Sequence, residues 1–298
     1  MINVKQRLKI MNIKPEKINR EQEIRKLLSL NPKQVLLKAQ QHLKVCDNLD
    51  DLHKHMAESI YSEIESNLKE GNDTNLILPI GPTSQYPHLI QKLTRNPLDL
   101  SKLWIFFMDE YSDYNGHVLP KSHPLSFRGI AEKLFLNQIP TSCQIQGNQI
   151  IFPSESNIDS IPEIIKSRGG INVCYGGIGI HGHIAFNEPE FNISLKSCRK
   201  VKLNRYTITI NAIRSKVGGN LENFPQFAYT LGMKEILSAK KIRLYCRNGS
   251  PYDWANTVLR LSVLGTPSDD YPVTYIRKHS NYQVITDQET LNTPQNII

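Results

Sequence analysis

The sequence predicts an α/β fold, Rossmann-like, in which a largely parallel sheet is flanked by helices. Two observations lead to this prediction: short apolar runs of strand length recur along the chain, and helical patterns separate several of them. Strands are expected at 75–80, 103–108, 149–152, 171–175, 228–231, 242–246 and 282–286. Helices are expected between several of them at 84–93, 129–136, 161–168 and 252–261. This alternation is typical of a parallel sheet that helices cover on both faces.

The N-terminal region differs from the rest of the chain in its charge. Residues 1–42 contain ten Lys or Arg against three Glu, so they account for most of the net charge of +8. Pro32 suits the first turn of a helix, and apolar side chains that recur every four residues predict an amphipathic helix at 50–68. We therefore expect a basic, solvated helical extension over 1–42, followed by an α/β domain over 43–298.

Composition restricts the class of protein and its partners. Hydrophobic residues make up 39% and charged residues 21%, which is typical of a soluble globular protein, and no apolar run approaches the roughly 20 residues of a membrane span. The basic excess lies in the arm without interleaved aromatic residues, which disfavours nucleic acid as a partner, while an acidic partner and a homo-oligomer stay open. Five scattered cysteines without a Cys-x-x-Cys pair disfavour a disulfide framework and a zinc site, and they favour the cytoplasm.

The first polar strand end is Gly81-Pro82-Thr83-Ser84, between a predicted strand and a predicted helix. Such a turn presents backbone N–H groups and hydroxyls at the positive end of the helix, which suits a phosphate group. Gly81, Thr83 and Ser84 are therefore candidate phosphate-binding residues. The alternative is an ordinary strand–helix turn, since many such turns contain Gly and Ser.

The second polar strand end is the acidic pair Asp109-Glu110, directly after the run 103–108. Packing explains this pair poorly, because a buried carboxylate is costly without partners. A carboxylate at this place could move a proton between neighbouring carbons of a sugar. The alternative is that Asp109 caps a helix.

The third strand end, 176–189, is the most distinctive stretch of the chain, with the sequence GGIGIHGHIAFNEP. Its glycines follow the run 171–175, at the kind of edge where α/β proteins build ligand sites. His183 can act as an acid or base near neutral pH, and we expect Glu188 to hold its ring and raise its pKa. The alternative is a glycine-rich turn whose histidines only make hydrogen bonds.

With these motifs, the chain resembles the glucosamine-6-phosphate deaminase family, within the superfamily of sugar-phosphate isomerases and 6-phosphogluconolactonases. The resemblance covers about 43–287 and leaves the basic arm outside. The similar segments are 78–84, 107–111, His123-Pro124 with Ser126-Phe127, 176–189, 272–279 and Asp287. The ending Asn187-Glu188-Pro189 is specific to the deaminase branch, whereas the lactonase branch shares only the glycine-rich core with its histidine.

The resemblance implies a reaction that needs no metal or organic cofactor. Members of the family open the ring of glucosamine 6-phosphate, isomerise the aldose to a ketose and release ammonia to give fructose 6-phosphate. By this resemblance, Asp109 is the base that moves the C2 proton to C1, His183 assists ring opening and Glu188 supports His183. The residues expected to bind substrate or phosphate are Gly81, Thr83, Ser84, Gly177, Gly179, Gly182 and Arg214.

The chain departs from the family pattern at three places. His181 stands two residues before the catalytic histidine, where the family has an Asp that orients and charges the imidazole, so we expect His181 in the catalytic site. Tyr252 stands where a phosphate-binding Lys is expected, and Gly81-Pro82 replaces Gly-Gly. The leading interpretation is an amino-sugar-phosphate deaminase/isomerase or a relative with a shifted substrate. A 6-phosphogluconolactonase-like hydrolase and a catalytically impaired sugar-phosphate sensor are the alternatives.

Overall fold

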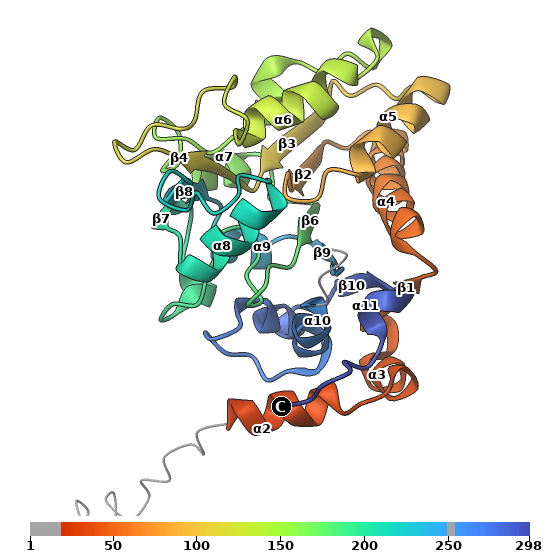
Figure 1. Ribbon diagram of the computed structural model, residues 1–298. Coiled ribbons are helices and arrows are strands. Elements are labelled where there is room, and N and C mark those ends of the chain that lie inside the picture. Colours follow the sequence, from red (N-terminus) through yellow and green to blue (C-terminus); the bar gives the residue numbers. More distant parts are fainter. Residues whose placement is uncertain (1–18, 249–253) are drawn as a thin grey trace, which may run out of the picture.

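The centre of the computed structural model, which describes residues 19–248 and 254–298, is a seven-stranded sheet (Figure 1). Every pairing in it is parallel, and the strand order is β1-β10-β9-β6-β2-β3-β5. Its strands are β1 (Leu43–Cys46), β2 (Thr74–Leu78), β3 (Leu103–Phe107), β5 (Ile150–Ile151), β6 (Val173–Gly177), β9 (Lys241–Tyr245) and β10 (Tyr282–Asp287). The predicted largely parallel α/β sheet is therefore confirmed.

Helices cover both faces of this sheet, as the alternation along the sequence predicted. They are α2 (Arg20–Leu28), α3 (Pro32–Ala39), α4 (Leu49–Lys69), α5 (Gln85–Arg95), α6 (Phe127–Leu134), α7 (Ile161–Ser167), α8 (Arg205–Arg214), α9 (Met233–Leu237), α10 (Ala255–Leu264) and α11 (Gln288–Leu291). Side chains of β2 alternate between two cores: Leu76 and Leu78 pack with the buried face of α4, and Ile77 packs in the core that contains α7 and α10. No helix among the described residues is long and apolar enough to cross a membrane.

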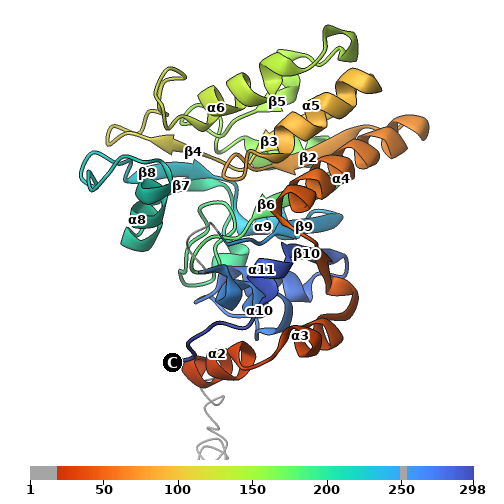
Figure 2. The same cartoon turned by 45° about the vertical axis from the view of Figure 1, so that its right-hand side comes forward.

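A second, antiparallel sheet of three strands lies beside the main one, and the sequence did not predict it (Figure 2). It contains β4 (Asp109–Ser112), β7 (Arg199–Lys202) and β8 (Phe227–Thr230). The strand expected at 228–231 exists as β8, but it belongs to this small sheet. Met108 is the corner between the sheets, because its N–H donates to Leu78 and its carbonyl accepts from Leu231.

The described part of the expected N-terminal extension packs into the domain instead of being solvated. Helix α3 begins at Pro32, as predicted, but its Val35 and Ala39 are buried in the main core. Helix α2 is held by an ion pair between Arg20 and Asp270, at 2.8 Å. The guanidinium of Arg260, fully buried, donates to the carbonyl of Leu30. Helix α3 therefore shares the core of the α/β domain, α2 is held at its edge, and residues 1–18 lie outside the described residues.

The order of the main sheet reverses between β2 and β6. From β2 the chain continues to β3 and β5 on one side, and from β6 it continues to β9 and β10 on the other. Ligands of open α/β sheets bind outside the carboxyl ends of the strands at such a point, because the loops that follow the two strands diverge there. The topology therefore predicts a ligand site at the loops that follow β2 and β6.

Candidate active site

A cavity of about 460 Å³ opens at the carboxyl ends of β2, β3 and β6. Its wall contains 79–83 after β2, Asp109 after β3 and 177–179 after β6. Helix α8 adds Asn211 and Arg214, and the end of β9 adds Tyr245 and Arg247. The volume lies within the range of sites for small molecules. All three strand ends that the sequence singled out thus meet in one cavity.

Among the predicted site residues, only some contact this cavity directly. Those in its wall are Gly81, Thr83, Asp109, Gly177, Gly179, His183 and Arg214. Those outside the wall are Ser84, His181, Gly182 and Glu188. The sequence missed Asn211 and Arg247 as wall residues. Tyr252 and its neighbours 249–251, where the family's Lys was expected, lie outside the described residues.

The two residues of the acidic pair have different environments: Glu110 is held by hydrogen bonds to neighbouring groups, whereas Asp109 lines the cavity. Glu110 accepts hydrogen bonds from the backbone N–H groups of Tyr111, Phe127 and Arg128 and from the hydroxyl of Ser126, at 2.7–3.2 Å. These bonds anchor the start of α6, whose N-cap is Ser126. Asp109 lines the cavity, so the alternative that it caps a helix is wrong.

The environment of Asp109 changes its acidity. Burial, together with the neighbouring Glu110 carboxylate, raises the pKa of Asp109 to about 8. At pH 7 the empty cavity therefore holds a mostly protonated Asp109, and the base form accumulates as the pH rises towards 8. A carboxyl group with this pKa can both accept and return a proton near neutral pH.

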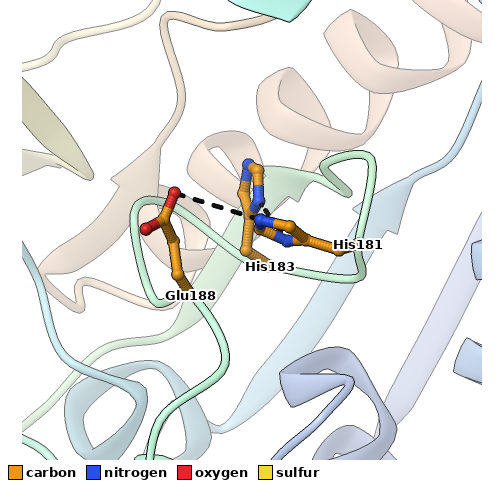
Figure 3. Close-up of side chains that lie close together, drawn as sticks. All are labelled: His181, His183 and Glu188. Atoms are coloured by element: carbon orange, nitrogen blue, oxygen red, sulfur yellow. Dashed lines mark hydrogen bonds and ion pairs between the residues drawn. The ribbon is translucent and has the colours of Figure 1, made fainter. Parts of the chain in front are cut away.

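His183 faces His181, its partner in the same loop (Figure 3). The two Nδ1 atoms lie 3.0 Å apart, and the rings are almost perpendicular. Burial lowers the pKa of His181, and burial together with the nearby His181 and Arg214 lowers the pKa of His183 well below 6.5. Both rings are therefore neutral at pH 7, and one donates its N–H to the lone pair of the other.

Glu188 lies next to His181, whereas the sequence predicted that it would hold His183. Its Oε1 is 4.0 Å from Nε2 of His181 (Figure 3). The expected rise in the pKa of His183 is wrong, because burial outweighs a carboxylate that acts from behind the first ring. The other oxygen of Glu188 accepts the N–H of Asn204 at 2.8 Å.

Asn204 links this loop to the start of α8. Its Nδ2 lies 2.6 Å from Nε2 of His181, and its Oδ1 accepts the N–H of Thr207 as the N-cap of the helix. Because one side chain caps the helix and contacts the histidine, α8 and the loop 178–189 are positioned together. The capping signal of an Asn before a helix was present in the sequence, but it did not indicate this contact.

Two glycines of the loop are required by the histidines. A Cβ atom on Gly179 would lie 1.9 Å from Nε2 of His183, so any side chain there displaces the ring. Gly182 has φ +73°, in the left-handed region, and its carbonyl accepts the N–H of Val273 at 2.7 Å. The glycine pattern that the sequence linked to substrate binding therefore also places His183.

Two arginines meet at the far side of the cavity. Arg214 ends α8, and its guanidinium lies 4.9 Å from the ring of Trp254. Burial, and then the charge of Arg247, lower the pKa of Arg214, which shows that the two cations lie within electrostatic reach of each other. Like charges are costly side by side, so this arrangement favours an anion between them.

Comparison with known proteins is informative at this point. No family model matches the sequence. A glucosamine-6-phosphate deaminase of Thermoanaerobacter sp. (strain X514) is 30% identical over 250 residues, covering 81% of this chain and 90% of the relative. Glucosamine-6-phosphate deaminase 2 of Bacillus subtilis (strain 168) is 30% identical over 249 residues, covering 82% and 93%.

Solved structures show the same fold. A monomeric glucosamine-6-phosphate deaminase superposes with a TM-score of 0.72 at 24% identity and covers 83% of this chain and 98% of its own. A 6-phosphogluconolactonase from Trypanosoma brucei superposes with a TM-score of 0.60 at 14% identity and covers 84% and 97%. Given the identity and coverage of the sequence relatives, this chain belongs to the glucosamine-6-phosphate deaminase family.

Proposed function

We propose that this protein is an amino-sugar-phosphate deaminase/isomerase that converts glucosamine 6-phosphate to fructose 6-phosphate and ammonia. The observation that carries the proposal is that one cavity combines an acid–base carboxyl group, Asp109, with an imidazole, His183, and a pair of arginines. The family relatives support the same reaction. Five buried free cysteines support a reducing compartment such as the cytoplasm.

The arginine pair fixes the orientation of the substrate. The phosphate would lie between Arg214 and Arg247, where guanidinium groups can form paired hydrogen bonds with its oxygens. The loop 79–83 borders the same cavity and adds the hydroxyl of Thr83 and backbone N–H groups. Arg247 thus supplies the second positive charge that the sequence did not find in the family's Lys position.

The reacting end of the sugar would then lie between Asp109 and His183. His183 takes the proton of the O1 hydroxyl and delivers it to O5 as the C1–O5 bond breaks, so the ring opens and the imidazole is regenerated. The carboxylate of Asp109 removes the proton from C2 and returns it to C1, which converts the 2-amino aldose into a 2-imino ketose. Water adds to C2 and ammonia leaves, so one water enters and one ammonia departs for each sugar. The last step is a hydrolysis.

The protonation state of Asp109 sets the pH dependence of this reaction. Because its pKa is raised to about 8, the base form grows about tenfold per pH unit below that value. We expect kcat/KM for glucosamine 6-phosphate to rise between pH 6 and pH 8 and to level off above it.

The test is ammonia release from purified protein with glucosamine 6-phosphate, and with galactosamine 6-phosphate in parallel. Asp109→Asn removes the base, and Glu65→Gln is the matched control, because Glu65 is a surface carboxylate of α4. We expect turnover in the wild type and in the control, and none in Asp109→Asn. Turnover that persists in Asp109→Asn contradicts the assigned role.

Two further arms separate the alternatives. Hydrolysis of 6-phosphogluconolactone without ammonia release would replace the deaminase proposal with a lactonase. Heat stabilisation by either amino-sugar phosphate without turnover would mark the protein as a sugar-phosphate sensor. Absence of both turnover and stabilisation contradicts a sugar-phosphate site altogether.

A further inference from the structure

Three side chains of the catalytic loop have the arrangement of metal ligands. One ring nitrogen of His181, one of His183 and one carboxylate oxygen of Glu188 all lie within 4.8 Å of one another (Figure 3). The two Nδ1 atoms are 3.0 Å apart. Oε1 of Glu188 is 4.0 Å from Nε2, the other ring nitrogen of His181. All three come from eight consecutive residues, so their placement depends on one loop and not on distant contacts.

One of these atoms has an unfilled bonding capacity. Oε1 of Glu188 is buried and has no hydrogen-bond partner among the residues that the structure describes. The other oxygen accepts the backbone N–H of Asn204, which holds the carboxylate in place, and Oε1 points towards the ring of His181. A buried carboxylate oxygen without a donor is costly, and a cation is a partner that removes this cost.

The two imidazoles can supply nitrogen lone pairs to a cation. Both histidines are partly buried, and burial favours the neutral form, which is the form that binds metals. Since each neutral ring carries one proton and one lone pair, two Nδ1 atoms at 3.0 Å place at least one lone pair in the gap between the rings. Oε1 of Glu188 approaches the other nitrogen of His181, Nε2, at 4.0 Å.

The donor set selects the kind of ion. Two imidazole nitrogens and one carboxylate oxygen are a common ligand set of Zn²⁺, and three protein ligands leave a fourth position open. Bonds of about 2.0–2.2 Å require ligand atoms within about 4 Å of each other, so the widest pair must close by about 1 Å. Gly179 and Gly182 flank the histidines, and rotation of the Glu188 side chain supplies the rest of the movement.

We propose that His181, His183 and Glu188 form a Zn²⁺ site whose occupation inhibits the enzyme. The inhibitory part rests on the proposed function, in which His183 takes a proton from the sugar. An ion bound to its ring occupies a lone pair that this transfer needs and fixes the ring beside the cavity. His181 stands where the resemblance implies an Asp, and it contributes one of the two nitrogens. The proposed site therefore depends on a residue in which this chain differs from the family pattern.

The binding test is calorimetric titration of ZnCl₂ alone into the metal-stripped full chain at pH 7.5. We expect one ion per chain, and binding weaker by at least about tenfold in His181→Asn and in Glu188→Gln, since even loss of an outer partner of a ligand costs about this much. The matched control is His117→Asn, because His117 and Glu155 form an exposed pair at 3.3 Å with only one imidazole. Absence of binding, or equal affinity in wild type and His181→Asn, overturns the proposal.

A second measurement needs no variant and therefore does not depend on how the variants fold. Co²⁺ added to the wild-type protein should give visible absorption bands of a nitrogen-ligated ion, and ZnCl₂ should remove them. A spectrum identical to that of free Co²⁺ overturns the site.

The inhibitory role is tested by ammonia release during the same zinc titration. We expect release to fall in proportion to occupancy and to return when EDTA is added. Full activity at full occupancy, or activation by Zn²⁺, overturns inhibition even if the ion binds. Activity of the EDTA-treated protein tests the deaminase proposal separately, because the calorimetric result does not depend on turnover.

Discussion

The raised pKa of Asp109 has a consequence for stability that one substitution isolates. In the unfolded chain the carboxyl group ionises at its ordinary pKa of 3.8, whereas in the folded protein it resists ionisation up to about 8. The folded pKa is the higher one, so the stability linked to this group is fully present below pH 3.8 and is lost as the pH rises through 8. Asp109→Asn removes the ionisable group and with it this loss.

The expected magnitude follows from the width of the window. Each pH unit between the two pKa values costs about 1.4 kcal/mol, which amounts to about 6 kcal/mol over the whole interval. Between pH 5.5 and pH 7.5, stability of the wild type should fall by about 3 kcal/mol relative to the Asn variant. The comparison uses the change with pH, since an amide in this buried site adds a constant offset.

Urea unfolding followed by tryptophan fluorescence at several pH values measures this difference. We expect the free energies of unfolding of the two proteins to diverge as the pH rises, with the variant becoming relatively more stable while it releases no ammonia. Parallel pH profiles between 5.5 and 7.5 would refute the reasoning, because they would mean that Asp109 is already ionised in the folded protein throughout this range.

Three further substitutions test other parts of the structure. Gly179→Ala should lower kcat at least about 100-fold, because its Cβ displaces the ring of His183, while circular dichroism stays unchanged; near-normal kcat contradicts the close approach. Arg247→Gln should raise KM for the sugar phosphate about 10–100-fold, the equivalent of one or two charge-assisted hydrogen bonds, and an unaltered KM removes it from the phosphate site. Val35→Ala should destabilise the fold by about 1–3 kcal/mol in urea unfolding, whereas a solvated extension would show no change.

Much of the main sheet could be predicted from local patterns. Continuous apolar runs such as Leu103–Phe107 mark parallel strands because both faces are covered, so the signal does not depend on distant residues. Two of the three strands of the small antiparallel sheet gave no such signal. Its strand β7 reads Arg-Lys-Val-Lys and alternates between partly buried and exposed positions, and β4 is the acidic pair with its neighbours. Their pairing with β8 is set by the corner at Met108, which is a tertiary feature.

The expectation of a solvated arm does not hold for α3, for a related physical reason. The net charge reflects the exposed side chains of α2 and α3. Where α3 packs depends instead on its two buried side chains, Val35 and Ala39. Arg260, which donates to the carbonyl of Leu30 in this region, is more than 200 residues away in the sequence. No sequence pattern around Arg260 predicts this contact. The number of charged residues therefore does not distinguish a solvated helical extension from helices that pack against the domain.

At the active site, the positions of the candidate residues were predictable and their partners were not. A glycine-rich strand end predicts that His183 lies at the cavity, because topology decides this. Which group holds its ring depends on side-chain directions within a loop, and there His181 lies between His183 and Glu188. Arg247 was missed for a similar reason, since a lone Arg after a strand has no motif and gains its meaning only opposite Arg214.

His181 stands where the resemblance implies an Asp, and this difference changes electrostatics more than geometry. Nδ1 of His181 still contacts the ring of His183 at 3.0 Å, so the orienting contact remains. The negative charge has moved outward to Glu188, 4.0 Å from the far nitrogen of His181, and Asn204 holds both groups at the start of α8. When His183 takes a proton, the stabilising carboxylate acts across an intervening neutral ring, which weakens it. The positive charge of Arg214 acts against the same proton, and in the proposed complex the substrate phosphate neutralises it. The proposed mechanism therefore couples substrate binding to the activation of His183, because the ring becomes a competent base only when the anion is in place.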